Sequence, residues 1–299
     1  MTQLSRRSLL KLTAGTAAVA LIAGAPALAS TPPDTLVQAF AIDDIISLDP
    51  AEAFELTTAE LTSNTYSLLV RLDLADTSKI TADAAESWTV SDDGLTYTFK
   101  LKPGLVFASG NPVTAADFAW SFERAVKLDK SPAFLLTQFG LTGENVADKA
   151  KAVDDLTFVL TVDQPYAPSF VLNVLTSTVG SAVDAKLVQA KAKAVTPTAE
   201  YAWDTDFGNE FLKTGCAGSG PFLTRVWKAN EAVVLEKNDA FFGDKAKLAR
   251  VIYRHLKESA GQRLALQAGD IDVARNLDPG DVAAVAKETS LATTSAGKA

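Results

Sequence analysis

Apolar and polar residues alternate most clearly over residues 86–101, which read ESWTVSDDGLTYTFKL. Alternation at every second position is typical of a strand with one buried face. The pair Asp93-Gly94 interrupts the alternation and suits a tight turn with positive φ at both positions. The pattern therefore predicts a β-hairpin, in which Trp88, Tyr97 and Phe99 are expected to be core residues rather than ligand contacts.

A helical period begins after Thr114. The hydroxyl of Thr114 can cap a helix, and Asp117 stands three residues later, as in a capping box. Apolar residues then recur at every fourth position and form one stripe: Phe118, Phe122 and Val126. Arg124 falls late in this predicted helix, where the helix dipole favours a cation.

The rest of the chain mixes short strands with helices. Strands are predicted at 35–41, 105–108, 156–162, 231–236, 250–254 and 271–274, and helices at about 57–69, 169–175 and 258–267. A loop-rich stretch covers 196–220. Because the elements follow no strict βαβ period, an α/β or α+β fold with more than one lobe fits best.

The N-terminus is typical of an export signal. Ser5-Arg6-Arg7 is followed by a weakly apolar run over 12–25 and by Ala27-Leu28-Ala29, so we expect cleavage between Ala29 and Ser30. The order Ser-Arg-Arg-x-Leu-Leu-Lys resembles the twin-arginine signal. The alternative is a permanent membrane anchor, which would need about 20 strongly apolar residues. We therefore predict an exported, soluble, periplasmic protein without a permanent anchor.

Charge and cysteine content exclude several classes of function. The net charge is −8, and removal of the first 29 residues with their three cations leaves −11. An acidic surface repels phosphate backbones, so nucleic acid is not expected as a partner. Cys216 and His255 are the sole cysteine and histidine. They allow neither an internal disulfide nor a Cys/His zinc site, so both are interpreted as structural and no cofactor is predicted.

Four stretches carry motifs that occur together in one known family. The most extensive is 85–126, with its Ala-Glu-Ser-Trp strand, Asp-Gly hairpin and Pro-Val-Thr-Ala-Ala-Asp helix start. The others are Leu48-Asp49-Pro50, the turn Gly218-Ser219-Gly220-Pro221-Phe222 with Trp227 and VVLEKN after it, and 268–274. In this order the four stretches resemble the family 5 extracellular solute-binding proteins of dipeptide, oligopeptide and nickel importers. The glycines of 218–220 are interpreted as a tight turn rather than a phosphate loop.

This resemblance implies an α/β fold of the periplasmic-binding-protein type II kind, with two lobes and a small inserted subdomain. The export signal would occupy 1–29. The first lobe would comprise 30–72 and 164–279, the inserted subdomain 73–163, and 280–299 would begin the connection to the second lobe. Family members continue well past this point, so the chain is expected to be truncated to most of the first lobe plus the inserted subdomain.

The resemblance also implies a function, namely capture of a small solute by lobe closure and its delivery to an inner-membrane ABC permease. The loop after Leu48-Asp49-Pro50 is expected to contact the ligand. There Glu55 would hold a ligand amine, and Phe54 or Leu56 would form an apolar wall. The alternative is an ordinary surface loop.

No motif points to catalysis, metal binding or an enzyme. The chain has no Gly-x-Ser-x-Gly and no His-Glu-x-x-His. Two other classes stay open at this point: a periplasmic peptide-binding chaperone and a secreted hydrolase with paired carboxylates. Within the importer interpretation the ligand is open between a dipeptide, a longer peptide, an opine-like or sugar compound, and a nickel chelate.

Overall fold

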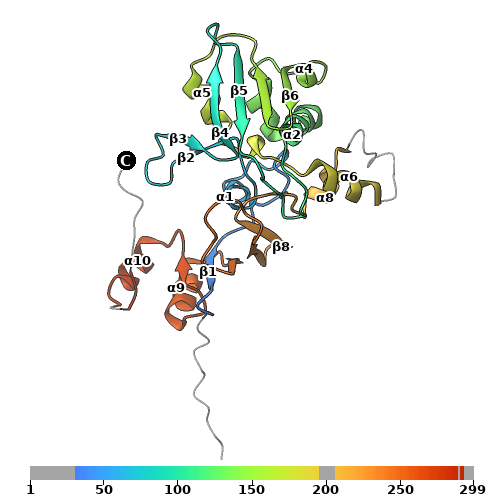
Figure 1. Ribbon diagram of the computed structural model, residues 1–299. Coiled ribbons are helices and arrows are strands. Elements are labelled where there is room, and N and C mark those ends of the chain that lie inside the picture. Colours follow the sequence, from blue (N-terminus) through green and yellow to red (C-terminus); the bar gives the residue numbers. More distant parts are fainter. Residues whose placement is uncertain (1–30, 195–205, 289, 293–299) are drawn as a thin grey trace, which may run out of the picture.

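The computed structural model describes residues 31–194, 206–288 and 290–292. The predicted export signal and its cleavage site at Ala29 and Ser30 lie outside the described residues. Figure 1 shows two sheet-containing regions, one near the top of the view and one below it, with helix α1 (Leu56–Thr65) between them.

The lower region is a five-stranded mixed sheet. In spatial order its strands are β11 (Val273–Ala274), β1 (Thr35–Phe40), β10 (Arg250–His255), β9 (Ala232–Lys237) and β8 (Phe222–Lys228). Strand β1 is parallel to both β10 and β11, whereas β10, β9 and β8 are antiparallel neighbours. The sheet therefore joins the beginning of the described chain to its last third.

The upper region is a four-stranded antiparallel sheet covered by helix α2 (Ala115–Leu128). Its strands, in spatial order, are β4 (Ala85–Val90), β5 (Thr96–Leu101), β7 (Thr157–Thr161) and β6 (Ala150–Asp154). Phe158 on β7 contacts Phe118 and Phe122 on α2, with ring centroids 6.1 and 5.2 Å apart. The predicted helical stripe is thus confirmed as the face that α2 buries against the sheet.

The remaining elements are short. Strands β2 (Val70–Leu72) and β3 (Ile80–Ala82) form a two-stranded sheet. Within the described ranges the other helices are α3 (Phe134–Thr137), α4 (Val146–Lys149), α5 (Pro168–Val174), α6 (Ala185–Ala194), α8 (Asn209–Leu212), α9 (Ser259–Ala268) and α10 (Pro279–Val285), with 3₁₀ turns at Ser131–Ala133 and Thr178–Gly180. The largest hydrophobic cluster extends from Ala51 to Ala182, so it crosses the predicted borders of 73–163.

The hairpin and the capped helix match the sequence predictions in most details. Tyr97 and Phe99 are fully buried, and Trp88 is partly buried. Thr114 and Asp117 form the reciprocal capping box. The turn differs in one respect: only Gly94 has positive φ, at 72°, whereas Asp93 lies outside the left-handed region.

Two element predictions were wrong in extent. The helix predicted to reach Leu69 ends at Thr65, because Tyr66 is extended (φ −120°, ψ 152°). The predicted strand at 105–108 is reduced to one isolated bridge, Val106 with Pro112. Four strands were missed: β2, β3, β6 and β8. Each lies at the edge of its sheet, where one face is half exposed and alternation is weak.

The Gly218–Gly220 turn owes its glycines to close packing rather than to positive φ. A Cβ on Gly218 would lie 2.0 Å from the carbonyl oxygen of Thr65, and one on Gly220 would lie 2.6 Å from the carbonyl carbon of Thr65. Gly220 also donates a backbone hydrogen bond to that Thr65 oxygen at 3.0 Å. The turn therefore packs directly against Thr65, the last residue of α1, and its Gly220 N–H occupies the carbonyl that a further helical turn would need.

We predict that Gly218→Ala lowers the free energy of unfolding by about 2 kcal/mol, because the added methyl group overpacks the backbone of Thr65. Gly280→Ala is the matched control. Its Cβ would meet no heavy atom within 4 Å among the described residues, and it stands in α10, where Ala is favoured over Gly by at most about 1 kcal/mol. Urea unfolding of both variants tests the contact, and equal stability of the two would contradict it.

Candidate ligand-binding site

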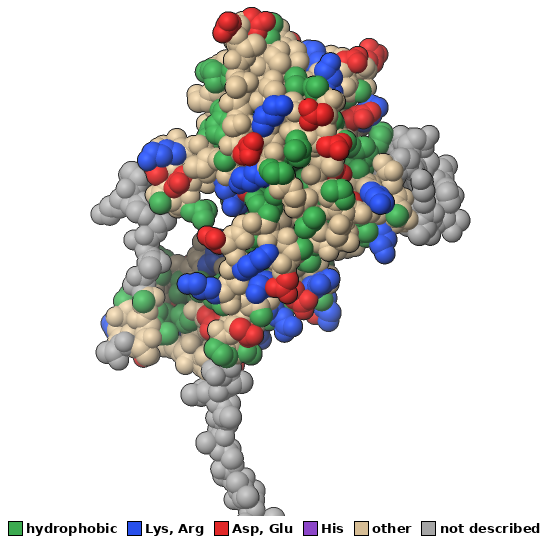
Figure 2. All heavy atoms as spheres, viewed as in Figure 1, with side chains coloured by type: hydrophobic (Ala, Val, Ile, Leu, Met, Phe, Trp, Pro, Cys, Tyr) green, Lys and Arg blue, Asp and Glu red, His purple; other side chains and the backbone are tan. Residues whose placement is uncertain are grey.

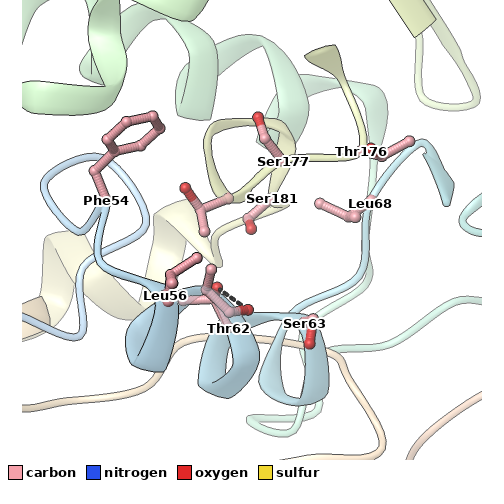
Figure 3. A pocket seen from close by; sticks show the side chains of 10 residues that line it. Phe54, Leu56, Thr62, Ser63, Leu68, Thr176, Ser177 and Ser181 are labelled. Carbon is pink, nitrogen blue, oxygen red and sulfur yellow. Dashed lines mark hydrogen bonds between the residues drawn. The ribbon is translucent and has the colours of Figure 1, made fainter. Parts of the chain in front are cut away.

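A cavity of about 310 Å³ lies between helix α1 and the segment 176–181. Figure 3 shows Leu56, Thr62 and Ser63 of α1 on one side, and Thr176, Ser177 and Ser181 on the other. The complete lining comprises Phe54, Leu56, Ala59, Thr62, Ser63, Leu68, Thr176, Ser177, Thr178 and Ser181. A volume of this size suits a small ligand or one side chain of a larger ligand.

Two of the three predicted contact residues line this cavity. Phe54 and Leu56 are 50% and 89% exposed, although apolar side chains of this size are usually buried. Phe54 also packs edge-to-face on Phe134, with ring centroids 5.4 Å apart. Glu55 is not among the described residues of the lining. It stands at the N-cap of α1, and its carboxylate accepts a hydrogen bond from the backbone N–H of Phe54 at 3.2 Å.

A buried ion pair fixes the loop that carries these residues. The Arg124 guanidinium donates two hydrogen bonds of 2.7 Å to the carboxylate of Asp49, one to each oxygen. Both side chains are almost completely buried, with 1% and 0% of their surface exposed. Asn209 and the backbone N–H of Ala51 donate to the same carboxylate at 2.8 and 2.9 Å. The carboxylate therefore accepts four hydrogen bonds, which compensates for its removal from water.

The interpretation of Arg124 as a helix-end cation misses its main role. Arg124 crosses from α2 to the Leu48-Asp49-Pro50 motif, and its Nε donates to the carbonyl of Phe207 at 3.1 Å. Burial alone would raise the pKa of Asp49, but the Arg124 charge and the hydrogen bonds outweigh it and hold this pKa below its ordinary value of 3.8. Asp49 thus stays ionised throughout the neutral range.

The loop is also held at its far end, next to the cavity. The backbone N–H of Ala53 donates to the carbonyl of Asp49 at 2.8 Å, and the carbonyl of Ala53 accepts a hydrogen bond from the Thr178 hydroxyl at 3.4 Å. Phe54 follows directly. The position of the apolar cavity wall is therefore set by the Asp49 ion pair on one side and by Thr178 on the other.

The opposite wall, Thr176 to Ser181, was not predicted. It follows directly after helix α5, more than 100 residues beyond Phe54 in the chain. An isolated bridge pairs its Ser181 with Leu68, three residues after the end of α1. The sequence LTSTVGSAV contains a cluster of hydroxyl residues after a predicted helix. That cluster was the available signal, but hydroxyl residues are also common in ordinary turns.

The other residues singled out in the sequence have structural surroundings. Nδ1 of His255 accepts a hydrogen bond from the backbone N–H of Ile42 at 3.1 Å. Cys216 is a free, partly buried thiol whose pKa is raised by burial. Within the described ranges, no three His, Cys, Asp or Glu side chains come together as a metal site would require. No helix in those ranges is long and apolar enough to cross a bilayer.

Charged side chains of both signs are interspersed on the face drawn in Figure 2. Among the described residues on this face, Lys and Arg do not gather into one continuous stripe. Long-range attraction of a polyanion requires such a patch. The ten residues that line the cavity, all of them described, carry no ionisable side chain.

A second cavity, of about 570 Å³, lies among β11, α9 and α10. Its wall includes Ser290, Leu291 and Ala292, which border undescribed residues on both sides. None of the predicted contact residues lies there. The first cavity is therefore the candidate site.

Comparison with known proteins identifies the family. The profile of the bacterial extracellular solute-binding proteins, family 5 Middle, matches residues 79–298. The chain belongs to this family. The sequence resemblance is thereby confirmed, and the relatives of this family 5 chain are solute-binding proteins.

Among curated relatives, the probable D,D-dipeptide-binding periplasmic protein DdpA of Escherichia coli (strain K12) is 32% identical over 266 residues, which cover 88% of this family 5 chain and 47% of DdpA. The oligopeptide-binding protein OppA of Bacillus subtilis (strain 168) is 26% identical over 236 residues, which cover 76% of this chain and 40% of OppA. The chain thus spans about half the length of the curated relatives it matches.

Solved structures agree on the fold. The periplasmic binding protein DppA from Helicobacter pylori, in complex with the peptide STSA, matches with a TM-score of 0.71 at 27% identity, over 85% of this family 5 chain and 49% of DppA. MoaA of A. tumefaciens R10, in complex with mannopinic acid, matches with a TM-score of 0.68 at 28% identity, over 85% and 47%. The predicted α/β fold of the periplasmic-binding-protein kind is confirmed, and the match to about half of each structure agrees with a truncated portion of it.

We predict that Asp49→Asn lowers the free energy of unfolding by about 3 kcal/mol at pH 7, because it leaves the buried Arg124 charge without its partner. The folded-state pKa of Asp49 lies below 3.8, so the stabilisation is present above pH 3.8 and is lost as the pH falls through the lower folded-state value. The difference between the variant and the parent protein should therefore shrink in acid.

Urea unfolding at pH 7 and near pH 3 measures this difference. Glu231→Gln is the control, since the Glu231 side chain is 69% exposed and its ion pair is with Lys228, which is 66% exposed. A loss for Asp49→Asn no larger than that of the control at pH 7 would contradict the role of the ion pair.

Proposed function

We propose that this chain is part of the periplasmic solute-binding subunit of an ABC importer, which captures a peptide or a similar small solute and delivers it to an inner-membrane permease. The export signal over 1–29, with its twin-arginine pattern, would bring the protein to the periplasm. Capture would proceed by closure of two lobes on the ligand, driven by the higher affinity of the closed state. The importer role requires no chemical step on the ligand.

The observation that carries this proposal is the cavity wall formed by Phe54 and Leu56. Two large apolar side chains remain exposed at the edge of a cavity, and the loop that bears them is anchored by a buried ion pair. A site that is formed before the ligand arrives loses less conformational entropy on binding. The family membership and the peptide complex of the H. pylori relative support a peptide as ligand.

Phe54 and Leu56 would form the apolar wall against the ligand, as proposed from the sequence. Glu55, beside them at the N-cap of α1, is partly exposed and is proposed to attract a ligand amine at the entrance. The domain limits 30–72, 73–163 and 164–279 also remain proposals.

Native mass spectrometry of the full-length protein, purified gently from the periplasmic fraction, tests the function. A series of bound masses that match peptides would support peptide capture. A single discrete adduct would favour a narrow ligand such as an opine-like compound or a metal chelate. The absence of any adduct, together with no thermal shift across a panel of peptides and other small solutes, would contradict the proposed function.

We predict that Leu56→Ala weakens ligand affinity about tenfold, because the variant loses apolar area that the ligand would bury. The melting temperature should not change, since Leu56 is 89% exposed in the absence of ligand. Leu74→Ala is a closely matched control: Leu74 is 93% exposed and lies between β2 and β3, outside the cavity lining. Isothermal titration calorimetry of both variants measures the difference, and equal affinities would remove Leu56 from the site.

A further inference from the structure

We propose that the cavity beside α1 selects an apolar ligand group that carries nitrogen hydrogen-bond donors, such as an amide or an ammonium group, and that it excludes a carboxylate. This inference rests on the proposed function, because it specifies what part of a captured peptide the cavity would hold. Most hydroxyl groups of the cavity wall already donate their protons to backbone carbonyls, so they can only accept hydrogen bonds from a ligand.

A serine or threonine hydroxyl has one proton to donate and two lone pairs that accept. On the α1 side, Thr62 shares its one proton between the carbonyls of Thr58 and Ala59, at 3.0 and 3.1 Å, and Ser63 donates to the carbonyl of Glu60 at 2.8 Å. Both protons are therefore already engaged within the helix. What these two hydroxyls can still offer to a ligand is their lone pairs.

The opposite wall has the same arrangement. Thr176 donates to the carbonyl of Asn173 at 2.7 Å, and Ser177 donates to the carbonyl of Val174 at 2.6 Å. Thr178 donates, at a longer 3.4 Å, to the carbonyl of Ala53. Five of the six hydroxyl groups around the cavity are thus acceptors toward the ligand.

Ser181 is the sixth hydroxyl, and it has no hydrogen-bond partner among the described residues. Its side chain is in the cavity lining, and the residue is only 2% exposed (Figure 3). An unpaired buried hydroxyl costs free energy until a partner is supplied. A ligand N–H could satisfy it, and it is the one lining side chain that could also donate.

The N-terminus of α1 does not reverse this preference. The backbone N–H of Thr57 donates to the carboxylate of Asp44 at 3.3 Å, and Glu55 occupies the N-cap. Two carboxylates are therefore already placed at the positive end of the helix dipole. A ligand carboxylate would find acceptor oxygens in the wall and acidic groups beside it, whereas an amide or ammonium group would find partners.

The apolar part of the ligand group would lie on Phe54, Leu56, Ala59 and Leu68, which supply the rest of the lining. The volume of about 310 Å³ limits the group to about one or two side chains. The cavity is therefore expected to bind one part of a longer ligand rather than its full length.

The test measures the affinity of the full-length protein for synthetic tripeptides by isothermal titration calorimetry. At each position in turn, Ala is replaced by Leu, Gln, Lys or Glu. We expect one position at which Leu, Gln and Lys are accepted and Glu binds at least about tenfold more weakly than Gln, because an unpaired carboxylate is costly to bury. Gln and Glu have nearly the same shape, so their comparison isolates the charge.

The double variant Thr62→Val, Thr176→Val replaces two acceptors by groups of nearly the same shape. It should weaken Gln and Lys peptides about fivefold at that position and leave the Leu peptide unchanged, because the ligand N–H loses its partner. Thr77→Val, at an exposed residue between β2 and β3, is the control and should change nothing.

The outcomes separate the two proposals. If tripeptides bind but Glu equals Gln at every position, or if the double variant leaves the Gln peptide unaffected, the cavity inference is wrong and peptide capture stands. If no tripeptide of the panel and no peptide recovered from the periplasm binds, the cavity inference and peptide capture are both wrong. The importer role itself fails only if the other small solutes also give no adduct and no thermal shift. A preference for Glu over Gln would overturn the inference directly.

Discussion

The bidentate pair between Arg124 and Asp49 is the interaction on which the arrangement of the candidate site depends. It joins helix α2, which packs on the upper sheet, to the loop that leads out of β1 in the lower sheet. Phe207 adds a third segment, and it adopts positive φ (47°), which is uncommon for an aromatic residue, while its carbonyl accepts from Arg124 Nε. Removing two charges from water costs several kcal/mol for each ion, so such a pair is tolerated only where its geometry is nearly ideal. Here the carboxylate accepts four hydrogen bonds and the guanidinium donates three, and together they define the position of one loop.

The parts of the fold that could be predicted from the sequence are those whose pattern is complete within one segment. The β4–β5 hairpin and helix α2 each bury one face, so their alternation and their four-residue stripe are unambiguous. The end of α1 was not predictable in this way. Apolar residues continue as far as Leu69, but the glycines of the 218–220 turn, about 150 residues later, press on Thr65 and end the helix. Strands β2, β3, β6 and β8 were missed because an edge strand has little to bury.

The residues of the candidate site also fall into two groups: those that a local motif predicts, and those that only contacts between distant segments bring together. Phe54 and Leu56 could be named from the sequence because they follow the Leu48-Asp49-Pro50 motif directly, and both line the cavity. The pairing of Asp49 with Arg124, 75 residues away, has no local signal, since an arginine near the end of a helix has an adequate explanation in the helix dipole. The Thr176–Ser181 wall likewise becomes part of a site through contacts distant in sequence, namely the bridge between Leu68 and Ser181 and the hydrogen bond from Thr178 to the carbonyl of Ala53.

The chemistry of the cavity follows from these constraints on the backbone. The last carbonyls of α5 accept backbone N–H groups of 176 and 177, and the hydroxyls of the same two residues donate to them as well. The same local hydrogen bonding occurs on α1, where Thr62 and Ser63 bond back to the preceding turn. In both walls the hydroxyl protons donate to backbone carbonyls, which leaves the hydroxyl lone pairs free to accept hydrogen bonds inside the cavity. The cavity is therefore lined by acceptors, and no charged residue belongs to its lining. The cavity would then be selective because its hydroxyl protons already donate to backbone carbonyls of the protein. A ligand with N–H groups could donate hydrogen bonds to both walls at once.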